Sequence, residues 1–394
     1  MAHTPPCSVS LHPLVGHEDV RASLANAHKK RILPAALLLH GARGVGKQRV
    51  ALWLAQLLVC ERPQLAPCGS CPACRMATGL EHPDIHWYFP VPRPKNASGD
   101  KLVDALEQAR LDEIAELRIR PLRASHSDDV RGLYLGTVRN LRSRAHMRPV
   151  MAPGPVFIIG EAERLVPQES SPEAANALLK LLEEPPGDTR FILTSSEPGR
   201  LLPTIRSRTV PLHLSPLPRS TVTNFLEQEV EVDAEKASWA AALAQGSPGR
   251  ALGFLPDGDE RGPLERLRRR AFELVVAALN PGASEGYGLA LAFPPAGARA
   301  LVDLFEFVEE WLRDLAAVAS GAPSAVLNHD ALSELERRVR EAKIAPFAAA
   351  RAFGSVERAR ELAWANVNPQ LVVGGLIHDL RAALRAGSTD GAVA

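Results

Sequence analysis

The sequence predicts an α/β domain followed by helical domains, and three observations support this prediction. Within roughly the first 215 residues, short apolar runs alternate with segments of helical periodicity, which is typical of a mainly parallel sheet covered by helices. A glycine-rich turn directly follows the first of these runs. From residue 258 onward the pattern is almost entirely helical, and a length of 394 residues is enough for two or three domains.

The predicted strands are four short apolar runs, at residues 35–39, 156–159, 191–194 and 210–214. The last run contains Pro211, which suits the edge of a sheet because proline donates no ladder hydrogen bond. Helical patterns lie between the strands, among them residues 48–60 and 174–183. Residues 89–127, in which a proline-rich start precedes a charged helical pattern, are predicted to be an insertion without assigned chemistry.

We expect three domains, at residues 1–216, 217–257 and 258–394. Clusters of proline and glycine at 216–218 and 256–259 are typical of linkers. The middle segment has a short helical pattern, and the third repeats apolar residues at helical spacing over 301–312 and 371–384. The last ten residues are expected to fray.

Composition excludes several classes of protein. Hydrophobic residues make up 46% of the chain and charged residues 23%, which argues against a largely disordered chain. A net charge of +1 excludes a protein held to nucleic acid or to an anionic membrane by its overall field. No apolar run is long enough to span a bilayer and the first residues lack a signal-peptide pattern, so we expect a cytoplasmic protein.

A phosphate-binding loop is predicted at residues 41–47. Gly41, Gly44, Gly46 and Lys47 fit the pattern G-x-x-x-x-G-K between a strand and a helix. The glycines allow backbone N–H groups to turn toward a phosphate, the helix directs its positive end to the same place, and the lysine reaches the outer phosphates. The alternative is a glycine-rich turn without a ligand.

Both expected protein contacts to magnesium are altered, one directly after this loop and one directly after the second predicted strand, residues 156–159. Gln48 stands where a serine or threonine hydroxyl normally ligates Mg²⁺, and Gly160 stands where an aspartate normally supports the metal. Glu161, which would orient the attacking water, is retained. Without Mg²⁺ the charge that develops between the phosphates is poorly neutralised. We therefore expect no ATP hydrolysis, while the binding of ATP or ADP stays open.

Four of the five cysteines form a predicted metal site. Cys60, Cys68, Cys71 and Cys74 have two overlapping C-x2-C units with prolines and a glycine between them, which suits a closed tetrahedral Zn²⁺ site of structural type. Free or redox-active thiols and an iron–sulfur cluster are the alternatives. Cys7 is predicted to be incidental.

Arginines follow the hydroxyl residues that end the third predicted strand. In a nucleotide-switch fold, Ser195 and Ser196 would face the γ-phosphate, and an arginine such as Arg208 could project across a subunit boundary. Spacing alone favours the alternative, an ordinary surface arginine paired with a carboxylate. Glu183 and Glu184 precede two prolines and are predicted to stop a helix rather than to form a catalytic pair.

A basic cluster precedes the second predicted strand. It could contact a phosphate backbone, but no aromatic residues are interleaved for base stacking, so a solvated helix face is favoured. Its members are Arg139, Arg142, Arg144, His146 and Arg148.

Together these segments resemble the AAA+ clamp-loader subunits of bacterial DNA polymerase III. The resemblance is weaker beyond residue 255, does not include 89–127, and departs at Thr209, where the family pattern Ser-Arg-Cys has cysteine. The motifs that carry it are 41–47, the four cysteines, 82–84, 175–186, 202–208, 246–252, 311–315 and 366–369.

The resemblance implies a RecA-like AAA+ P-loop domain with a zinc module at 60–74, a small helical lid and a helical collar. It also implies a hetero-pentameric ring with gamma/tau and delta subunits that opens the sliding clamp and loads it onto primer–template DNA during DNA replication. Arg208 would be an arginine finger acting in trans. Arg250 would be the second-sensor arginine of a degenerate site formed with Gly41, Gly44, Gly46, Lys47, Gln48, Glu161 and Ser195.

The expected function is that of a non-hydrolysing stator within the DNA-directed DNA polymerase III holoenzyme, with no ATPase activity of its own. One alternative is a gamma/tau-like motor subunit, against which Gln48 and Gly160 argue because family motors keep both magnesium contacts. Another is a zinc-stabilised DNA-binding module, against which the near-neutral charge and the lack of stacking aromatics argue.

Overall fold

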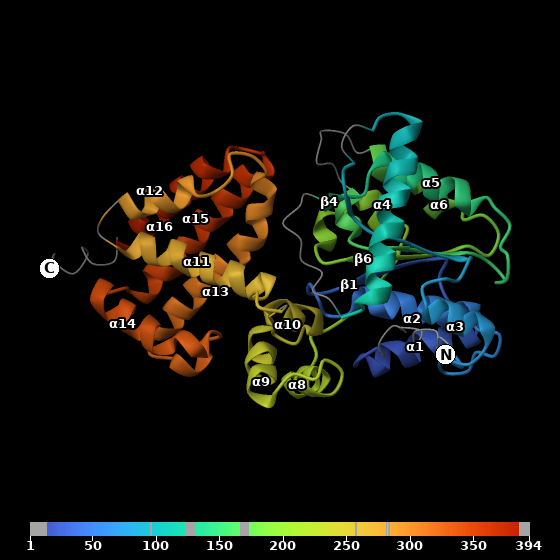
Figure 1. Ribbon diagram of the computed structural model, residues 1–394, viewed down its shortest axis with the longest axis horizontal. Helices are drawn as coiled ribbons and strands as arrows, with labels where there is room; N and C mark the ends of the chain where they lie inside the picture. Colours follow the sequence, from blue (N-terminus) through green and yellow to red (C-terminus); the bar gives the residue numbers. More distant parts are fainter. Residues whose placement is uncertain are drawn as a thin grey trace, which may run out of the picture. The chain divides into compact units, whose positions relative to one another are not determined.

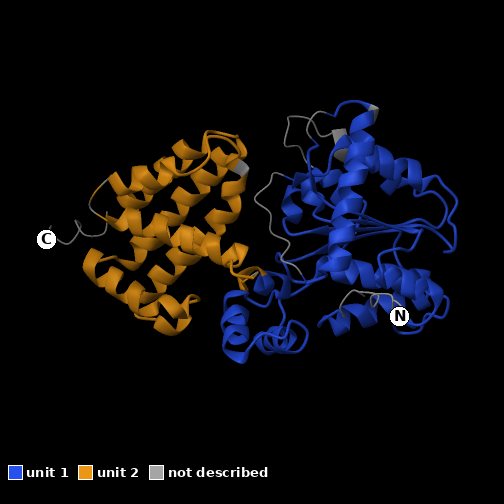
Figure 2. Cartoon of the chain, in the orientation of Figure 1, with its two compact units in different colours: residues 1–125, 131–252 blue, residues 126–130, 253–394 orange. Residues whose placement is uncertain are grey.

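The computed structural model describes residues 14–94, 97–122, 131–165, 173–256, 258–280, 282 and 284–385. The chain divides into two compact units, one of residues 1–125 and 131–252, the other of residues 126–130 and 253–394 (Figure 2). Residues 217–252 belong to the first unit, and the division into three domains stays a prediction. Cys7 and the last nine residues lie outside the described residues.

The first unit is built on a five-stranded parallel sheet with the order β2-β5-β6-β1-β7. Figure 1 shows this sheet, with β1 and β6 labelled. All four predicted strands are confirmed, and the one that contains Pro211 lies at the edge. Strand β2 (Ile85–Tyr88) was not predicted, because His86 interrupts its apolar pattern. The strands are β1 (Ala36–His40), β2 (Ile85–Tyr88), β5 (Val156–Ile159), β6 (Arg190–Ser195) and β7 (Val210–His213).

Helices cover both faces of this sheet, which explains why its central strands each contain an uninterrupted apolar run. Successive side chains of a strand point to opposite faces, so Leu37 and Leu39 join one core while Ala36 and Leu38 join the other. The first core includes residues of α1, α2, α3 and α4, and the second includes residues of α5 and α6. The helices of this unit are α1 (Glu18–Lys29), α2 (Lys47–Val59), α3 (Pro72–Thr78), α4 (Asp100–Ile119), α5 (Leu135–Ala145), α6 (Glu173–Glu183), α7 (Pro203–Arg206), α8 (Arg219–Gln228), α9 (Ala234–Leu243) and α10 (Pro248–Phe254).

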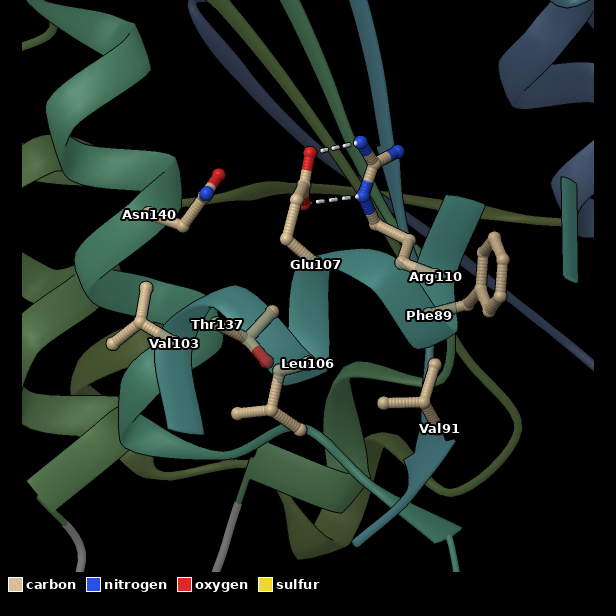
Figure 3. Close-up of a pocket in the computed structure, with 8 residues that line it drawn as sticks. All are labelled: Phe89, Val91, Val103, Leu106, Glu107, Arg110, Thr137 and Asn140. Carbon is tan, nitrogen blue, oxygen red and sulfur yellow. Dashed lines mark hydrogen bonds and ion pairs between the residues drawn. The ribbon is translucent and has the colours of Figure 1, made fainter. Parts of the chain in front are cut away.

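The segment 89–127 is a folded part of the first unit over its described residues. Its strand β3 (Val91–Pro92) pairs with β4 (Arg131–Gly132), and Leu106 and Ile114 of α4 are buried in the core. Glu107 and Arg110 pair beside a small cavity of about 10 Å³ (Figure 3), room for about one water. Residues 123–127 lie outside the described residues.

The second unit is helical throughout its described residues. Helix α13 packs against α11 and α15, and α15 packs against α16; the predicted helical segments 301–312 and 371–384 are confirmed as parts of α13 and α16. No helix among the described residues is both long and apolar enough to cross a membrane. The helices are α11 (Pro263–Leu279), α12 (Ser284–Leu291), α13 (Leu301–Ala319), α14 (Leu332–Ala342), α15 (Pro346–Trp364) and α16 (Pro369–Arg385).

Candidate functional site

The predicted phosphate loop connects β1 to α2, at the carboxyl end of the sheet, and it packs against the start of α10. Gly44 has φ 74°, and a Cβ there would lie 2.5 Å from the backbone nitrogen of Arg250. The Gly249 N–H donates to the Gly44 carbonyl at 2.8 Å. The loop therefore approaches the backbone of residues 249–250 more closely than any residue other than glycine allows.

The Lys47 ammonium is turned into its own loop. It is 6% exposed and donates to the Gly41 carbonyl at 2.9 Å, the Ala42 carbonyl at 2.7 Å and Ser196 Oγ at 3.0 Å. Burial lowers the pKa of Lys47 to about 8, although nearby Glu163 and Glu161 oppose this change. An ammonium has three donors, so all three are engaged within the protein.

Gln48 occupies the space beside Gly160. A Cβ on residue 160 would lie 2.9 Å from Gln48 Oε1, and that oxygen accepts a hydrogen bond from Trp87 Nε1 at 3.1 Å. The two positions that lack magnesium ligands are thus in contact. A side chain on residue 160 would therefore require the Gln48 amide to move.

The acidic residues after β5 have different surroundings. Glu161 has φ 49° and pairs with Arg164, its Oε2 lying 2.7 Å from Nε. Glu163, which sequence reasoning missed, is 7% exposed and accepts a hydrogen bond from the Ser196 N–H at 3.0 Å. Burial raises the pKa of Glu163. The sequence could have indicated Glu163, because it follows Glu161 by two residues. The 3₁₀ turn Ala162–Leu165 brings Glu163 back toward the ends of the strands.

The hydroxyl residues that end β6 have separate roles. Ser196 contacts the Lys47 ammonium, whereas the hydroxyl of buried Ser195 accepts a hydrogen bond from the Glu197 N–H at 3.2 Å. The predicted contact between Ser195 and a γ-phosphate stays a prediction. Arg250 lies at the start of α10, and its backbone nitrogen is close to Gly44 of the loop.

The four cysteines come together between the end of α2 and the start of α3. Their sulfur atoms all lie within 4.8 Å of one another, and the Cys68 and Cys74 sulfurs are 3.9 Å apart. A tetrahedral Zn²⁺ site with bonds of about 2.3 Å places its sulfurs about 3.8 Å apart. The arrangement therefore suits one bound metal ion.

Backbone N–H groups support this arrangement of sulfurs. The amide groups of Cys68, Cys71 and Cys74 donate to the sulfurs of Cys60, Cys68 and Cys71, at 3.3–3.4 Å. Donation from Cys71 and Ser70 lowers the pKa of Cys68 to about 5 and favours the thiolate, the form that binds metal.

Asp84, in the motif at 82–84, is a structural residue. It is 3% exposed, and its carboxylate accepts hydrogen bonds from the N–H groups of Val150, Met151 and Ala152 at 2.7–2.8 Å. Burial alone would raise the pKa of Asp84, but these three donors lower it below its ordinary value. The carboxylate therefore fastens the loop that leads into β5.

Arg208 follows α7 and pairs with Glu183, the last residue of α6. Its Nη1 also donates to the Thr204 carbonyl at 2.9 Å and to Ser207 Oγ at 3.3 Å. This is the paired surface arginine that spacing alone favoured. In the basic cluster, Arg139 and Arg142 are exposed, as a solvated helix face predicts, while Arg144 pairs with Glu107 at 3.0 Å.

Comparison with known proteins gives the family. The family described as "DNA polymerase III, delta subunit" matches residues 16–218, about half of the chain. The chain belongs to this family. The predicted resemblance to subunits of DNA polymerase III is confirmed, and delta′ is among the matching subunits.

Curated relatives agree with this assignment. The chain is 36% identical to DNA polymerase III subunit delta′ of Pseudomonas aeruginosa, over 54% of this chain and 53% of that protein. It is 31% identical to the delta′ subunit of Escherichia coli, over 55% and 53% respectively. It is also 34% identical to the gamma/tau subunit of Mycobacterium bovis, over 62% and 36%. The chain thus spans about half the length, or less, of these relatives.

Similar solved structures include a gamma subunit-related protein from Thermotoga maritima, with 16% identity and a TM-score of 0.35, covering 93% of this chain and 99% of that chain. A single-residue variant of RuvB from the same organism has 16% identity and a TM-score of 0.37, covering 84% of this chain and 91% of that chain.

Proposed function

We propose that this chain is a clamp-loader subunit of delta prime type that does not hydrolyse ATP. One observation carries the proposal: Gln48 fills the space beside Gly160, where the aspartate that supports Mg²⁺ belongs. The inward turn of Lys47 adds to it, because binding of a triphosphate would have to replace three hydrogen bonds. Without a metal and a free lysine, the charge that develops on the phosphates is not neutralised.

The same proposal assigns the chain a passive place in a cytoplasmic ring of gamma/tau and delta subunits, which loads the sliding clamp onto primer–template DNA. Arg208 would complete the ATP site of a neighbouring motor subunit. Four cysteine sulfurs within 4.8 Å of one another support Zn²⁺ as the ion held by Cys60, Cys68, Cys71 and Cys74. The identity with gamma/tau relatives makes a motor subunit the second candidate, and the altered magnesium contacts oppose it.

The test is Arg208→Ala in the loader assembled with its motor and delta partners. At the site that Arg208 completes, hydrolysis should fall about tenfold or more, since an arginine finger in trans contributes about 10³–10⁵-fold in related enzymes. Phosphate release on primed DNA measures the effect. Arg206→Ala is the matched control, because Arg206 is an exposed arginine two residues away.

Two results would contradict the proposal. Unchanged turnover with Arg208→Ala would remove the finger role. ATP turnover by the isolated chain that disappears with Lys47→Ala would instead favour the motor candidate.

A further inference from the structure

Three contacts within its own chain hold the guanidinium of Arg208. Nη1 donates to the Thr204 carbonyl and to Ser207 Oγ, at 2.9 and 3.3 Å, and Nη2 pairs with Glu183 Oε1. Nε is buried and has no hydrogen-bond acceptor among the described residues. Both hydrogens of Nη1 and one of Nη2 are therefore in use.

This arrangement prevents the two-donor contact that makes arginine a phosphate ligand. A guanidinium binds phosphate bidentately through two adjacent N–H groups that point the same way. As placed here, Arg208 can offer one free Nη2 hydrogen to an incoming anion. When Glu183 leaves, both Nη2 hydrogens become available, so Arg208 can donate to two phosphate oxygens instead of one.

The ion pair between Arg208 and Glu183 is weak. The Arg208 and Glu183 side chains are 31% and 43% exposed, and ion pairs with this degree of solvent contact are weak. A triphosphate carries several negative charges where a carboxylate carries one, so it competes well for the same guanidinium. No covalent bond changes, since one anion replaces another at Nη2.

We propose that Glu183 is a latch that holds Arg208 back until a neighbouring subunit presents a nucleoside triphosphate. The proposal rests on the in-trans role of Arg208 given above and adds its regulation. Glu183 ends α6, and Arg208 lies two residues beyond α7, which packs on α6. The contact between these two helices thus controls when the arginine is available.

The experiment compares Glu183→Gln with Glu184→Gln in the assembled loader. Glu184 is the adjacent exposed carboxylate and forms no ion pair among the described residues, so its variant should behave like the unaltered chain. Glu183→Gln keeps the shape of the side chain and removes its charge. It should raise ATP hydrolysis in the absence of DNA about two- to fivefold, the range that weak ion pairs allow, and addition of Arg208→Ala should abolish this gain.

A second measurement needs no partner subunit. Phenylglyoxal condenses with accessible guanidinium groups, and mass spectrometry of the Arg208 peptide gives the rate in the isolated chain. Glu183→Gln should raise this rate by a similar factor, and Glu183→Asp, with a shorter side chain, should give an intermediate rate. Far-ultraviolet circular dichroism confirms that each variant is folded.

The outcomes separate the latch from the function on which it rests. Loader turnover that is unchanged or lower with Glu183→Gln, while Arg208→Ala is still damaging, overturns the latch and leaves the finger in place. An Arg208 modification rate that does not change with Glu183→Gln also overturns the latch. If Arg208→Ala has no effect on turnover, the in-trans role of Arg208 on which the latch rests is wrong.

Discussion

The side chain of Gln48 and the absence of a side chain at Gly160 are coupled, although the two residues are far apart in the sequence. The Gln48 amide occupies the space where a side chain at residue 160 would begin, and Trp87 holds that amide by a hydrogen bond. The two positions that differ from the expected magnesium ligands therefore share one packed polar contact.

This coupling predicts a non-additive effect of two substitutions. Gly160→Ala alone should lower the free energy of unfolding by about 1 kcal/mol, because the new methyl group displaces Gln48 from its hydrogen bond with Trp87. In a Gln48→Ala background the same change should be neutral or slightly stabilising, since the space is then free and alanine restricts the unfolded chain. Urea denaturation of the four proteins measures the coupling.

Additive free energies in this cycle would show that the two residues do not share space. Gly154→Ala is not a suitable control, because a Cβ there would meet the backbone of Asp188. Gly199→Ala is suitable, since a Cβ at Gly199 would meet nothing within 4 Å. It should give the same small effect with either residue at position 48.

For single residues, the sequence predicts which magnesium ligands are absent but not which side chains occupy their places. The motif spacing identifies Gln48 and Gly160, yet their contact depends on the order of strands in the sheet, which no local pattern encodes. The sequence did not predict the role of Glu163 or the partner of Arg208 for the same reason. Glu163 contacts Ser196 and Arg208 contacts Glu183, and in each pair the two residues are far apart in the sequence.

At the level of secondary-structure elements, the four cysteines Cys60, Cys68, Cys71 and Cys74 form a module that joins the end of α2 to the start of α3. Cys71 is the N-cap of α3 and Cys74 lies in its first turn, while Cys60 directly follows α2. Cys60, Cys71 and Cys74 also belong to the core on one face of the sheet. A metal ion there would hold two helix ends and part of that core together.

Removal of the metal should therefore destabilise the first unit. Chelation, or Cys71→Ser, should lower the free energy of unfolding by about 3 kcal/mol or more, because the four cysteines lose the cross-link that the bound metal provides. Metal analysis should find one zinc per chain, and thermal unfolding should give the loss of stability. Cys7→Ser is the matched control and should change neither quantity; intact stability after complete removal of metal would contradict the structural role.

Sequence patterns are sufficient to predict three of the strands. β1, β5 and β6 each contain an uninterrupted apolar run because both of their faces are covered, and such runs are recognisable without a structure. β2 was not recognisable, because His86 lies beside the ring of Phe157, with ring centroids 4.8 Å apart, rather than in solvent. The attachment of α4 likewise depends on tertiary contacts, such as the hydrogen bond at 3.1 Å from Arg110 Nη1 to the Trp87 carbonyl.

In the molecule as a whole, each of the two units has a buried core of its own. That of the second unit contains a polar centre at Asp314, which is fully buried and lies in the motif at 311–315. Its carboxylate accepts hydrogen bonds from the N–H groups of Leu327 and Asn328 and from Asn328 Nδ2, at 2.6–2.9 Å. Trp311 Nε1 in the same motif donates to the Arg268 carbonyl at 2.9 Å. The motif thus fixes the interior of the helical unit.

Separate cores predict separate unfolding transitions. Asp314→Ala leaves three buried donors without an acceptor and should lower the stability of the second unit by about 3 kcal/mol or more. Asp379→Ala in the same unit breaks only a half-exposed pair with Arg358, 3.4 Å long, and should have little effect. In calorimetry, chelation should lower one transition and Asp314→Ala the other, with combined effects that add within about 0.5 kcal/mol. A single transition lowered by both changes would mean that the two cores unfold as one, because independent cores respond only to the contacts that each contains.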